Sequence, residues 1–247
     1  MSRPDQVTER VERTPRDVAA PTVTCCVMAW NEAASLRVVV EELHSGLRAL
    51  GVAYEILIID DGSTDGTSEL ADAIAAENGD VRVIHHGENR GLGAAYRTGF
   101  EHGRGTYLTF FPADGQFPAA LLARFFPLIE GYDLVLGNLS SRRDSLKGRL
   151  LTRAERLLYW VLFGSVPRLE GMLMIRRSIL AAIPLKSHGR GHANVWELVI
   201  RAARAGYRHT GVAIEVRRRM AGQSKVNNFR TIRANLMQVL QLRRLLK

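Results

Sequence analysis

The sequence predicts an α/β domain with a single, mostly parallel central sheet and helices on both faces. Apolar runs of strand length alternate with stretches of helical spacing from Val23 to Gly137. The run 54–59 ends in two carboxylates, Asp60 and Asp61, and a Gly-Ser-Thr-Asp turn follows them. Such a run is typical of a buried parallel strand that delivers polar groups to the carboxyl edge of the sheet, where open α/β folds bind ligands.

The first half of the chain is predicted to consist of repeated strand–helix units. Leucine and valine recur at helical spacing from Leu36 onward, Gly51 ends that helix, and Gly91 opens a later one. Short connections fit right-handed strand–helix–strand units. The expected strands are 23–28, 55–59, 81–85, 106–111 and 133–137, and the expected helices are 36–50, 67–78, 91–103 and 121–129.

The pattern changes after Gly137, but we expect one domain to continue over residues 22–228. A loose polar arm, 1–21, precedes it, and a basic amphipathic helix, 229–247, follows it. The elements expected between Gly137 and that helix are a helix with a basic face at 146–163, a strand at 171–175, a helix at 195–205 and a strand at 209–216.

Size and composition point to a cytoplasmic globular protein. The chain has 247 residues, of which 46% are hydrophobic and 7% aromatic, and this is enough for a sizeable core. No apolar run reaches about 18 residues, so no transmembrane helix is expected, and residues 1–21 lack the apolar segment of a signal peptide. Cys25 and Cys26 are neighbours on a predicted strand and point to opposite faces, which fits buried thiols in a reducing compartment.

The net charge of +9 is unevenly distributed. Residues 217–247 contain nine Lys or Arg and no Asp or Glu, and a second basic cluster spans 142–156. These stretches could be a solvated surface, or they could face phosphate, anionic lipid or nucleic acid. Stacking aromatic residues are sparse in them, which argues against nucleic acid.

Two short motifs could bind phosphate or metal. Gly91-Leu92-Gly93 is not a dinucleotide-binding motif, because Tyr96 stands where the third glycine belongs, yet its helix start could approach a phosphate. Asp114 and Gln116 follow a predicted strand and present oxygens on one side of an extended chain. Hard divalent cations use few such ligands and fill their shell with water and phosphate. An ordinary Asp turn is the alternative for this segment.

Together the motifs resemble family 2 glycosyltransferases. Trp30-Asn31-Glu32, the Asp60–Asp65 block, Asn89–Gly93 and Ala113–Gln116 appear in the order and spacing of that family. The resemblance implies the GT-A nucleotide-diphospho-sugar transferase fold and inversion at the sugar carbon. Residues 217–225, with Arg217-Arg218-Arg219 and Gly222-Gln223-Ser224-Lys225, are similar to a segment of polyprenyl (dolichyl) phosphate hexose synthases. The likeness covers roughly Thr22 to Asn227.

The resemblance also implies site residues. Asp114 and Gln116 would hold Mg²⁺ or Mn²⁺ on the donor diphosphate, while Arg219 and Lys225 would close over the phosphates. Glu197 matches an acidic position of the family and is the candidate general base, with a helix-surface glutamate as the alternative. Glu32 would contact the nucleoside or else compensate the charge of a helix N-terminus. The full set expected around the donor is Ala29, Trp30, Glu32, Ile59, Asp60, Asp61, Arg90, Gly91, Ala113, Asp114, Gln116, Arg219 and Lys225.

Three departures from the family pattern concern the metal and the acceptor. Pro112 replaces the first Asp of the usual Asp-x-Asp. The family's Gly-Ser-Arg is Gly-Asn-Leu at 137–139, so its phosphate-binding arginine is missing unless Arg142 or Arg143 substitutes. The Asp that normally precedes a Gly-Phe pair is replaced in Leu169-Glu170-Gly171.

Three functions follow as hypotheses. The first is transfer of a hexose from a UDP- or GDP-sugar to a polyprenyl phosphate by a protein that meets the inner face of the membrane. The second is a soluble transferase that acts on a small natural product. The third is a nucleotide-sugar binding protein without turnover, which the loss of an Asp at Pro112 suggests. The basic helix 229–247 could lie on an anionic bilayer, or pack on the domain or a second subunit.

Overall fold

The computed structural model describes residues 20–139, 160–164, 166–220, 237 and 241–246. Nearly all of the polar arm expected at 1–21 lies outside these ranges, as do the basic cluster 142–156, Lys225, and most of the helices expected at 146–163 and 229–247.

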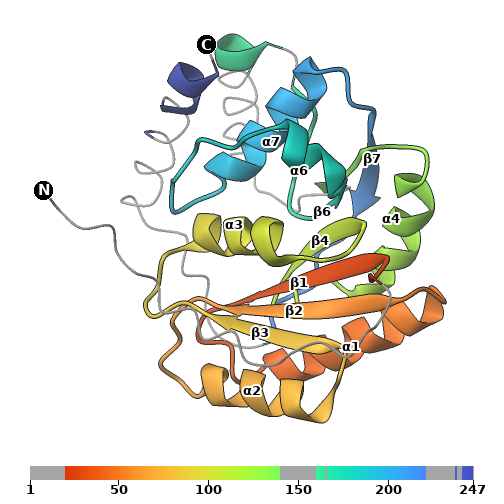
Figure 1. The fold of residues 1–247 in the computed structure, drawn as a ribbon, viewed down its shortest axis with the longest axis vertical. Coiled ribbons are helices and arrows are strands. Elements are labelled where there is room, and N and C mark those ends of the chain that lie inside the picture. Colours follow the sequence, from red (N-terminus) through yellow and green to blue (C-terminus); the bar gives the residue numbers. More distant parts are fainter. Residues whose placement is uncertain (1–19, 140–159, 165, 221–236, 238–240, 247) are drawn as a thin grey trace, which may run out of the picture.

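Seven strands form one sheet, in the order β3-β2-β1-β4-β6-β5-β7 (Figure 1). β6 runs antiparallel to both of its neighbours, and the other pairings are parallel, which confirms the mostly parallel sheet. The strands are β1 (Val23–Ala29), β2 (Tyr54–Asp60), β3 (Val81–His85), β4 (Tyr107–Pro112), β5 (Leu134–Leu139), β6 (Leu173–Arg176) and β7 (His209–Ile214).

Helices cover both faces of the sheet, as the sequence predicts. One core contains the apolar sides of α1, α2 and α4, and a second core on the opposite face contains those of α3, α6 and α7. Cys25 packs in the first core and Cys26 in the second, and both thiols are free and buried. The helices are α1 (Leu36–Ala49), α2 (Thr67–Glu77), α3 (Leu92–His102), α4 (Leu122–Ile129), α6 (Ser178–Ala182) and α7 (Ala193–Arg204).

The described end of the chain packs on α7. Leu242 is 1% exposed and belongs to a small apolar cluster with Phe163 and Ile200. The Arg201 guanidinium donates to the carbonyl of residue 245 at 2.9 Å, and that of Arg204 donates to the carbonyl of residue 246 at 3.0 Å. This end therefore follows the packing alternative for the tail. Within the described ranges, no helix has the length and apolar character needed to cross a bilayer.

We expect Leu242→Ala to lower the free energy of unfolding by about 2 kcal/mol, because it removes buried apolar volume and leaves a cavity. Leu245→Ala is the matched control: that side chain lies on the same segment but is 38% exposed. Its replacement should change stability by less than about 0.5 kcal/mol. Urea unfolding of both variants is the measurement. Equal effects of the two substitutions would show that the C-terminal segment does not pack on α7 in solution.

Candidate functional site

Backbone hydrogen bonds connect the end of β1 to the residues that follow β2 and β4, its two neighbours in the sheet. The Ala29 carbonyl accepts the Asp61 amide at 2.8 Å, and the Met28 carbonyl accepts the Ala113 amide at 2.9 Å. Since all three strands are parallel and end in register, the acidic side chains after β2 and β4 emerge at one edge of the sheet, on either side of β1.

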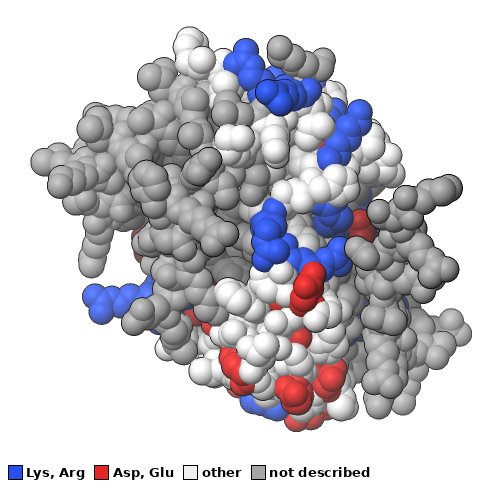
Figure 2. Space-filling view, turned by 90° about the vertical axis from the view of Figure 1, so that its left-hand side faces the viewer, with Lys and Arg blue, Asp and Glu red and all other residues white. Residues whose placement is uncertain are grey.

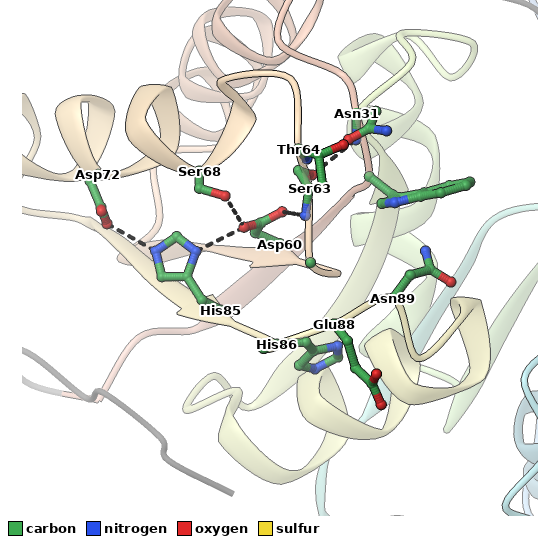
Figure 3. A pocket seen from close by; sticks show the side chains of 13 residues that line it. Asn31, Asp60, Ser63, Thr64, Ser68, Asp72, His85, His86, Glu88 and Asn89 are labelled. Atoms are coloured by element: carbon green, nitrogen blue, oxygen red, sulfur yellow. Dashed lines mark hydrogen bonds and ion pairs between the residues drawn. The ribbon is translucent and has the colours of Figure 1, made fainter.

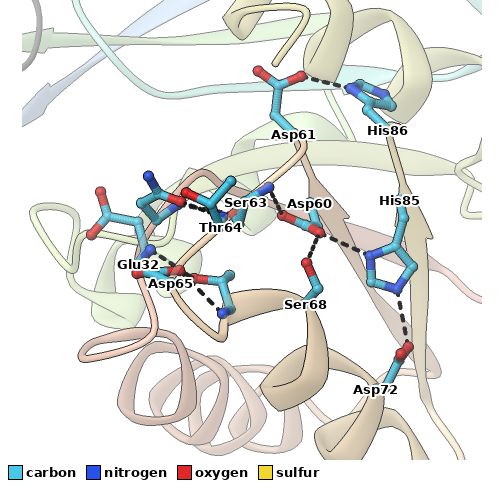
Figure 4. Close-up of polar contacts among 12 residues, drawn as sticks. Glu32, Asp60, Asp61, Ser63, Thr64, Asp65, Ser68, Asp72, His85 and His86 are labelled. Atoms are coloured by element: carbon cyan, nitrogen blue, oxygen red, sulfur yellow. Dashed lines mark hydrogen bonds and ion pairs between the residues drawn. The ribbon is translucent and has the colours of Figure 1, made fainter. Parts of the chain in front are cut away.

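Asp60 is a buried carboxylate surrounded by donors. It is 1% exposed, and it accepts hydrogen bonds from the Ser63 amide at 3.1 Å, the Ser68 hydroxyl at 2.6 Å and His85 Nδ1 at 2.9 Å. His85 Nε2 lies 3.0 Å from Asp72, so the ring bridges two carboxylates (Figure 4). Burial raises the pKa of Asp60, but the hydrogen bonds from His85, Ser63 and Ser68 more than offset this and lower it. The Asp60 hydrogen bond, opposed by burial and aided by Asp72, raises the pKa of His85 to about 9.

A pocket of about 660 Å³ opens beside Asp60. It lies between the turns that follow β1, β2 and β3, and it has the size of a small-ligand site. Figure 3 shows that Asp60 and His85 form one wall, with Asn89 and Glu88 from the β3–α3 turn (residues 86–91) on another side. The indole of Trp30, which is 37% exposed, offers an aromatic surface in the same pocket. A carboxylate, an imidazole and an aromatic face can together hold a planar polar ring.

Asp61 holds the β3–α3 turn instead of lining this pocket. Its carboxylate accepts the amides of Arg90 at 2.9 Å and Gly91 at 2.8 Å, and His86 Nδ1 lies 2.7 Å away (Figure 4). Next to it, Gly62 has φ +67°, and a Cβ there would overlap the backbone of Glu88. The paired acids therefore divide their roles: Asp60 lines the pocket and Asp61 fixes the turn beside it. The sequence-based expectation that Asp61 belongs to the set around the donor stays a prediction.

A second acidic cluster lies after β4. The Arg219 guanidinium is 2.9 Å from Asp114 Oδ2 and 2.9 Å from Glu32 Oε1, so one cation is shared by two carboxylates that follow different strands, β4 and β1. Asp114 is 5% exposed, its Oδ1 accepts the amide of Gln116 at 2.9 Å, and its carbonyl accepts the amide of Met220 at 3.1 Å. The segment that carries Arg219 is thereby fixed against the tip of β4.

This cluster has too few oxygen ligands to hold a divalent cation alone. It fits one when a bound ligand supplies further oxygens. Within the described ranges, no three His, Cys, Asp or Glu side chains gather as metal ligands. Asp114 offers one carboxylate, and Gln116 stands two residues later at the same strand end. Mg²⁺ and similar ions are commonly held by one or two carboxylates together with substrate phosphates and water. The site thus fits a metal that binds together with a diphosphate.

The remaining expected residues have different environments. Ile59, Ala29 and Ala113 are buried in the core at the strand ends, with exposures of 0%, 2% and 0%, so any ligand contact from these three would come mainly through the backbone. Arg90 is exposed on the β3–α3 turn. Lys225 lies outside the described residues.

Glu197 is a buried charge on α7, and the alternative that it is a helix-surface glutamate is wrong. It is 0% exposed, its carboxylate accepts the amides of Lys186 and Ser187 at 3.0 and 2.7 Å, and Arg201 Nε lies 2.8 Å away. Burial raises the pKa of Glu197, but hydrogen bonds from Ser187, Lys186 and Arg201 lower it below its ordinary value. A carboxylate so surrounded is a weak base.

Sequence reasoning missed both histidines. His85 is the last residue of the predicted strand 81–85 and His86 follows it, and in a parallel sheet this places them beside the acids at the end of the neighbouring strand. The signal was therefore present in the sequence as a polar pair at a strand end. The contact of Arg190 with Asn89, at 2.8 Å to its carbonyl, joins residues 101 positions apart and had no local signal.

His85 predicts a pH-dependent term in stability. Its pKa is about 9 in the folded protein, against about 6.5 unfolded, so its contribution is complete below about pH 6.5 and disappears as pH rises through 9. We expect His85→Gln to lose about 2 kcal/mol at pH 6, allowing for a ring that is 31% exposed, and to match the wild type near pH 10. Urea unfolding of both proteins from pH 6 to 10 measures this difference. A difference that stays constant over that range would mean that the ring is not protonated.

Comparison with known proteins identifies the family. Residues 24–183 match the family described as Glycosyl transferase family 2. Undecaprenyl-phosphate mannosyltransferase from Micrococcus luteus is 31% identical, over 83% of this chain and 87% of its own length. Polyprenol monophosphomannose synthase from Mycolicibacterium smegmatis is 30% identical, over 92% and 89%. Undecaprenyl-phosphate 4-deoxy-4-formamido-L-arabinose transferase from Pseudomonas paraeruginosa is 33% identical, but this chain spans only about half of that relative, at 49% of its length.

Solved structures share the fold at lower identity. Mannosyl-3-phosphoglycerate synthase from Rubrobacter xylanophilus superposes with a TM-score of 0.68 at 20% identity, over 91% of this chain and 74% of that one. Glucosyl-3-phosphoglycerate synthase from Mycobacterium tuberculosis gives 0.66 at 20% identity, over 90% and 80%. A mannosyltransferase from Pyrobaculum calidifontis, solved with GDP-Man and Mn²⁺, gives 0.59 at 18% identity, over 94% and 77%. The expected GT-A fold is thus confirmed, and the chain belongs to glycosyl transferase family 2.

Proposed function

We propose that this protein is an inverting glycosyltransferase that moves a hexose from a UDP- or GDP-sugar to a polyprenyl phosphate, with Mg²⁺ or Mn²⁺ as cofactor. The observation that carries the acceptor is the likeness to two relatives named for transfer to, or synthesis on, such lipids. That likeness extends over 83% and 92% of this chain and nearly the whole of each relative. A likeness limited to the donor-binding half of the chain would not cover so much of this chain and of each relative.

The donor fits the two clusters at the sheet edge. The nucleoside would enter the pocket beside Trp30 and Asp60, and the diphosphate would extend past the end of β1 towards Asp114 and Arg219. Arg219 now neutralises two carboxylates, and in the complex its guanidinium would turn to the phosphates. Glu32 stays close enough to orient it. We also propose that Lys225 joins this phosphate clamp.

The chemistry needs positive charge where the leaving diphosphate develops negative charge, and Arg219 would supply part of it. A divalent cation held by Asp114 and Gln116 would supply the rest when bound. A lipid phosphate is already ionised near neutral pH and can attack without a general base. This fits Glu197, whose carboxylate is occupied by N–H donors from its own domain.

A direct assay tests the proposal. Purified protein is incubated with UDP- and GDP-hexoses and either Mg²⁺ or Mn²⁺, in separate reactions with undecaprenyl phosphate, with 3-phosphoglycerate, and without acceptor. We expect a glycolipid product only with the lipid phosphate. Transfer to phosphoglycerate would replace the acceptor part of the proposal with the small-molecule hypothesis. Donor binding without transfer or hydrolysis in any reaction would favour the non-catalytic hypothesis.

Asp114→Asn should lower the transfer rate by at least about 100-fold, because the charge that anchors the cation is lost while the side-chain shape is kept. Rates at limiting and saturating Mn²⁺ are the measurement. Asp133→Asn is a matched control: Asp133 Oδ1 also lies beside an arginine, 3.5 Å from Arg176 Nε, but Asp133 directly precedes β5 and is not near the end of β4. An Asp114→Asn protein as active as the wild type at limiting metal would remove Asp114 from the metal site.

A lipid acceptor also requires a surface that meets the membrane, and we propose the end of the molecule where residues 160–164 and 241–246 pack together. Trp160 and Val161 are 63% and 59% exposed there, and Arg243 and Arg244 lie on the adjoining segment. Figure 2 shows Lys and Arg side chains at the upper end and in the middle of this face, with a few lower down, and Asp and Glu mainly towards the lower end. Each basic residue near an anionic surface contributes about 1 kcal/mol.

Trp160→Ala should weaken binding to vesicles that contain anionic lipid, and binding should fall as salt is added. Liposome flotation at low and high salt measures this. Val38→Ala, at an exposed apolar residue on α1, serves as the control and should bind as the wild type does. If Trp160→Ala floats as well as the wild type, this end of the molecule is not the membrane surface.

A further inference from the structure

The loop between α6 and α7, residues 183–192, forms an outer support of the nucleotide pocket. The Arg190 carbonyl accepts the Gly93 amide at 2.9 Å, and its guanidinium donates to the Asn89 carbonyl at 2.8 Å. The Asn194 side chain, just after the loop, donates to the Gly93 carbonyl at 2.7 Å. A Cβ on Gly91 would lie 2.7 Å from the Arg190 carbonyl oxygen, so the two backbones are in direct contact. Backbone and side-chain contacts therefore join the loop and the start of α3 into one unit.

That unit includes the pocket wall. Asn89 lines the pocket, and the next two residues, Arg90 and Gly91, donate their amides to Asp61. A displacement of Arg190 would reach Asn89 directly, and it would reach the Asp61 carboxylate through Gly91. The position of one pocket wall thus depends on a loop that arrives from the other half of the chain.

Glu197 is what fixes that loop. Its carboxylate accepts the amides of both Lys186 and Ser187, at the point where the chain enters the exposed part of the loop. On the other side of the loop, Arg97 from α3 donates to the Ser187 carbonyl at 2.6 Å. Three N–H groups, those of the Lys186 and Ser187 backbone and of Arg201 Nε, surround a carboxylate with 0% exposure, and such a group is costly to replace by a neutral one.

We propose that Glu197 is a positioning residue for the donor, and that it acts through Arg190 on the β3–α3 turn, which closes the nucleotide pocket. This inference rests on the proposed function for the identity of the ligand. It replaces the role of general base, because Glu197 faces its own loop and not the pocket. Arg190 is the link between the buried charge and the pocket wall.

The first test reads the turn in the free protein. Amide hydrogen exchange at Arg90, Gly91 and Gly93 should speed up by about 10-fold or more in Glu197→Gln and in Arg190→Ala, because the turn loses its outer support. Arg204→Ala is the matched control: it removes an arginine at the other end of α7, whose partners are the carbonyls of residues 246 and 163. It should leave these amides unchanged. No change in either test variant overturns the proposal.

The second test reads the ligand. Both variants should weaken binding of UDP or GDP, and raise the donor KM, by about 10-fold, with kcat within about 3-fold. The nucleotide affinity of the double variant should lie within about 2-fold of that of the single variant that binds less tightly. The reason is that both residues act along one path. The pH profile of kcat should keep its shape in Glu197→Gln. Additive losses of affinity would instead show that Glu197 acts independently of Arg190. A large loss of kcat with unchanged donor affinity, together with loss of the acidic limb of the pH profile, would make Glu197 a general base.

The two tests also separate this proposal from the proposed function. If wild type binds neither UDP nor GDP, the proposed function fails, and exchange at residues 90–93 still decides whether Glu197 and Arg190 hold the turn. If Glu197→Gln does not fold, the exposed Arg190 carries both tests alone. Faster exchange with unchanged nucleotide affinity would show that the turn is loosened without consequence for the donor, and it would overturn the positioning role.

Discussion

Burial of a carboxylate costs free energy unless donors or cations surround it, and the carboxyl edge of this sheet buries several. Asp60, Asp61 and Asp114 are each at most 5% exposed. Different groups stabilise each of these charges: serine donors and a histidine at Asp60, backbone amides at Asp61, and a guanidinium at Asp114. The local structure of the edge consists largely of the groups that satisfy these charges. The turns after β2 and β3 and the segment 217–220 each take their position from one acid.

This constraint links sequence-distant segments. Asp61 holds the turn after β3, and Asp114 holds the segment that carries Arg219, 105 positions later. Glu197 does the same for the α6–α7 loop. Asp60, Asp61 and Asp114 thus serve first as anchors, and Asp60 also lines the pocket. In a site of this kind, an acidic residue in a motif marks either a ligand contact or the anchor of one, and geometry decides which.

Much of the fold was predictable because β1, β2 and β4 are mainly apolar runs, and α1 and α4 each carry an apolar stripe. These are local signals, whereas the order β3-β2-β1-β4 is a property of the folded sheet that the sequence pattern did not predict. The antiparallel direction of β6 was not predictable. More than 30 residues separate β6 from β5, and the sequence of a four-residue strand, 173–176, does not indicate in which direction the strand runs. Asp60 and Asp114 were found from strand ends. The division of roles between Asp60 and Asp61 and the burial of Glu197 required tertiary contacts with His86, Gly91 and Ser187, which no local pattern encodes.

The sharing of Arg219 between Glu32 and Asp114 affects how the protein should respond to ionic strength. Under the proposed function, an incoming diphosphate would compete with these two carboxylates for one guanidinium. Dissolved salt screens the attraction between ligand and protein, but it also screens the internal pairs that must be given up, although their burial limits this second effect. The two effects have opposite signs. The affinity for an anionic ligand should therefore vary less with salt than a chain of net charge +9 would suggest.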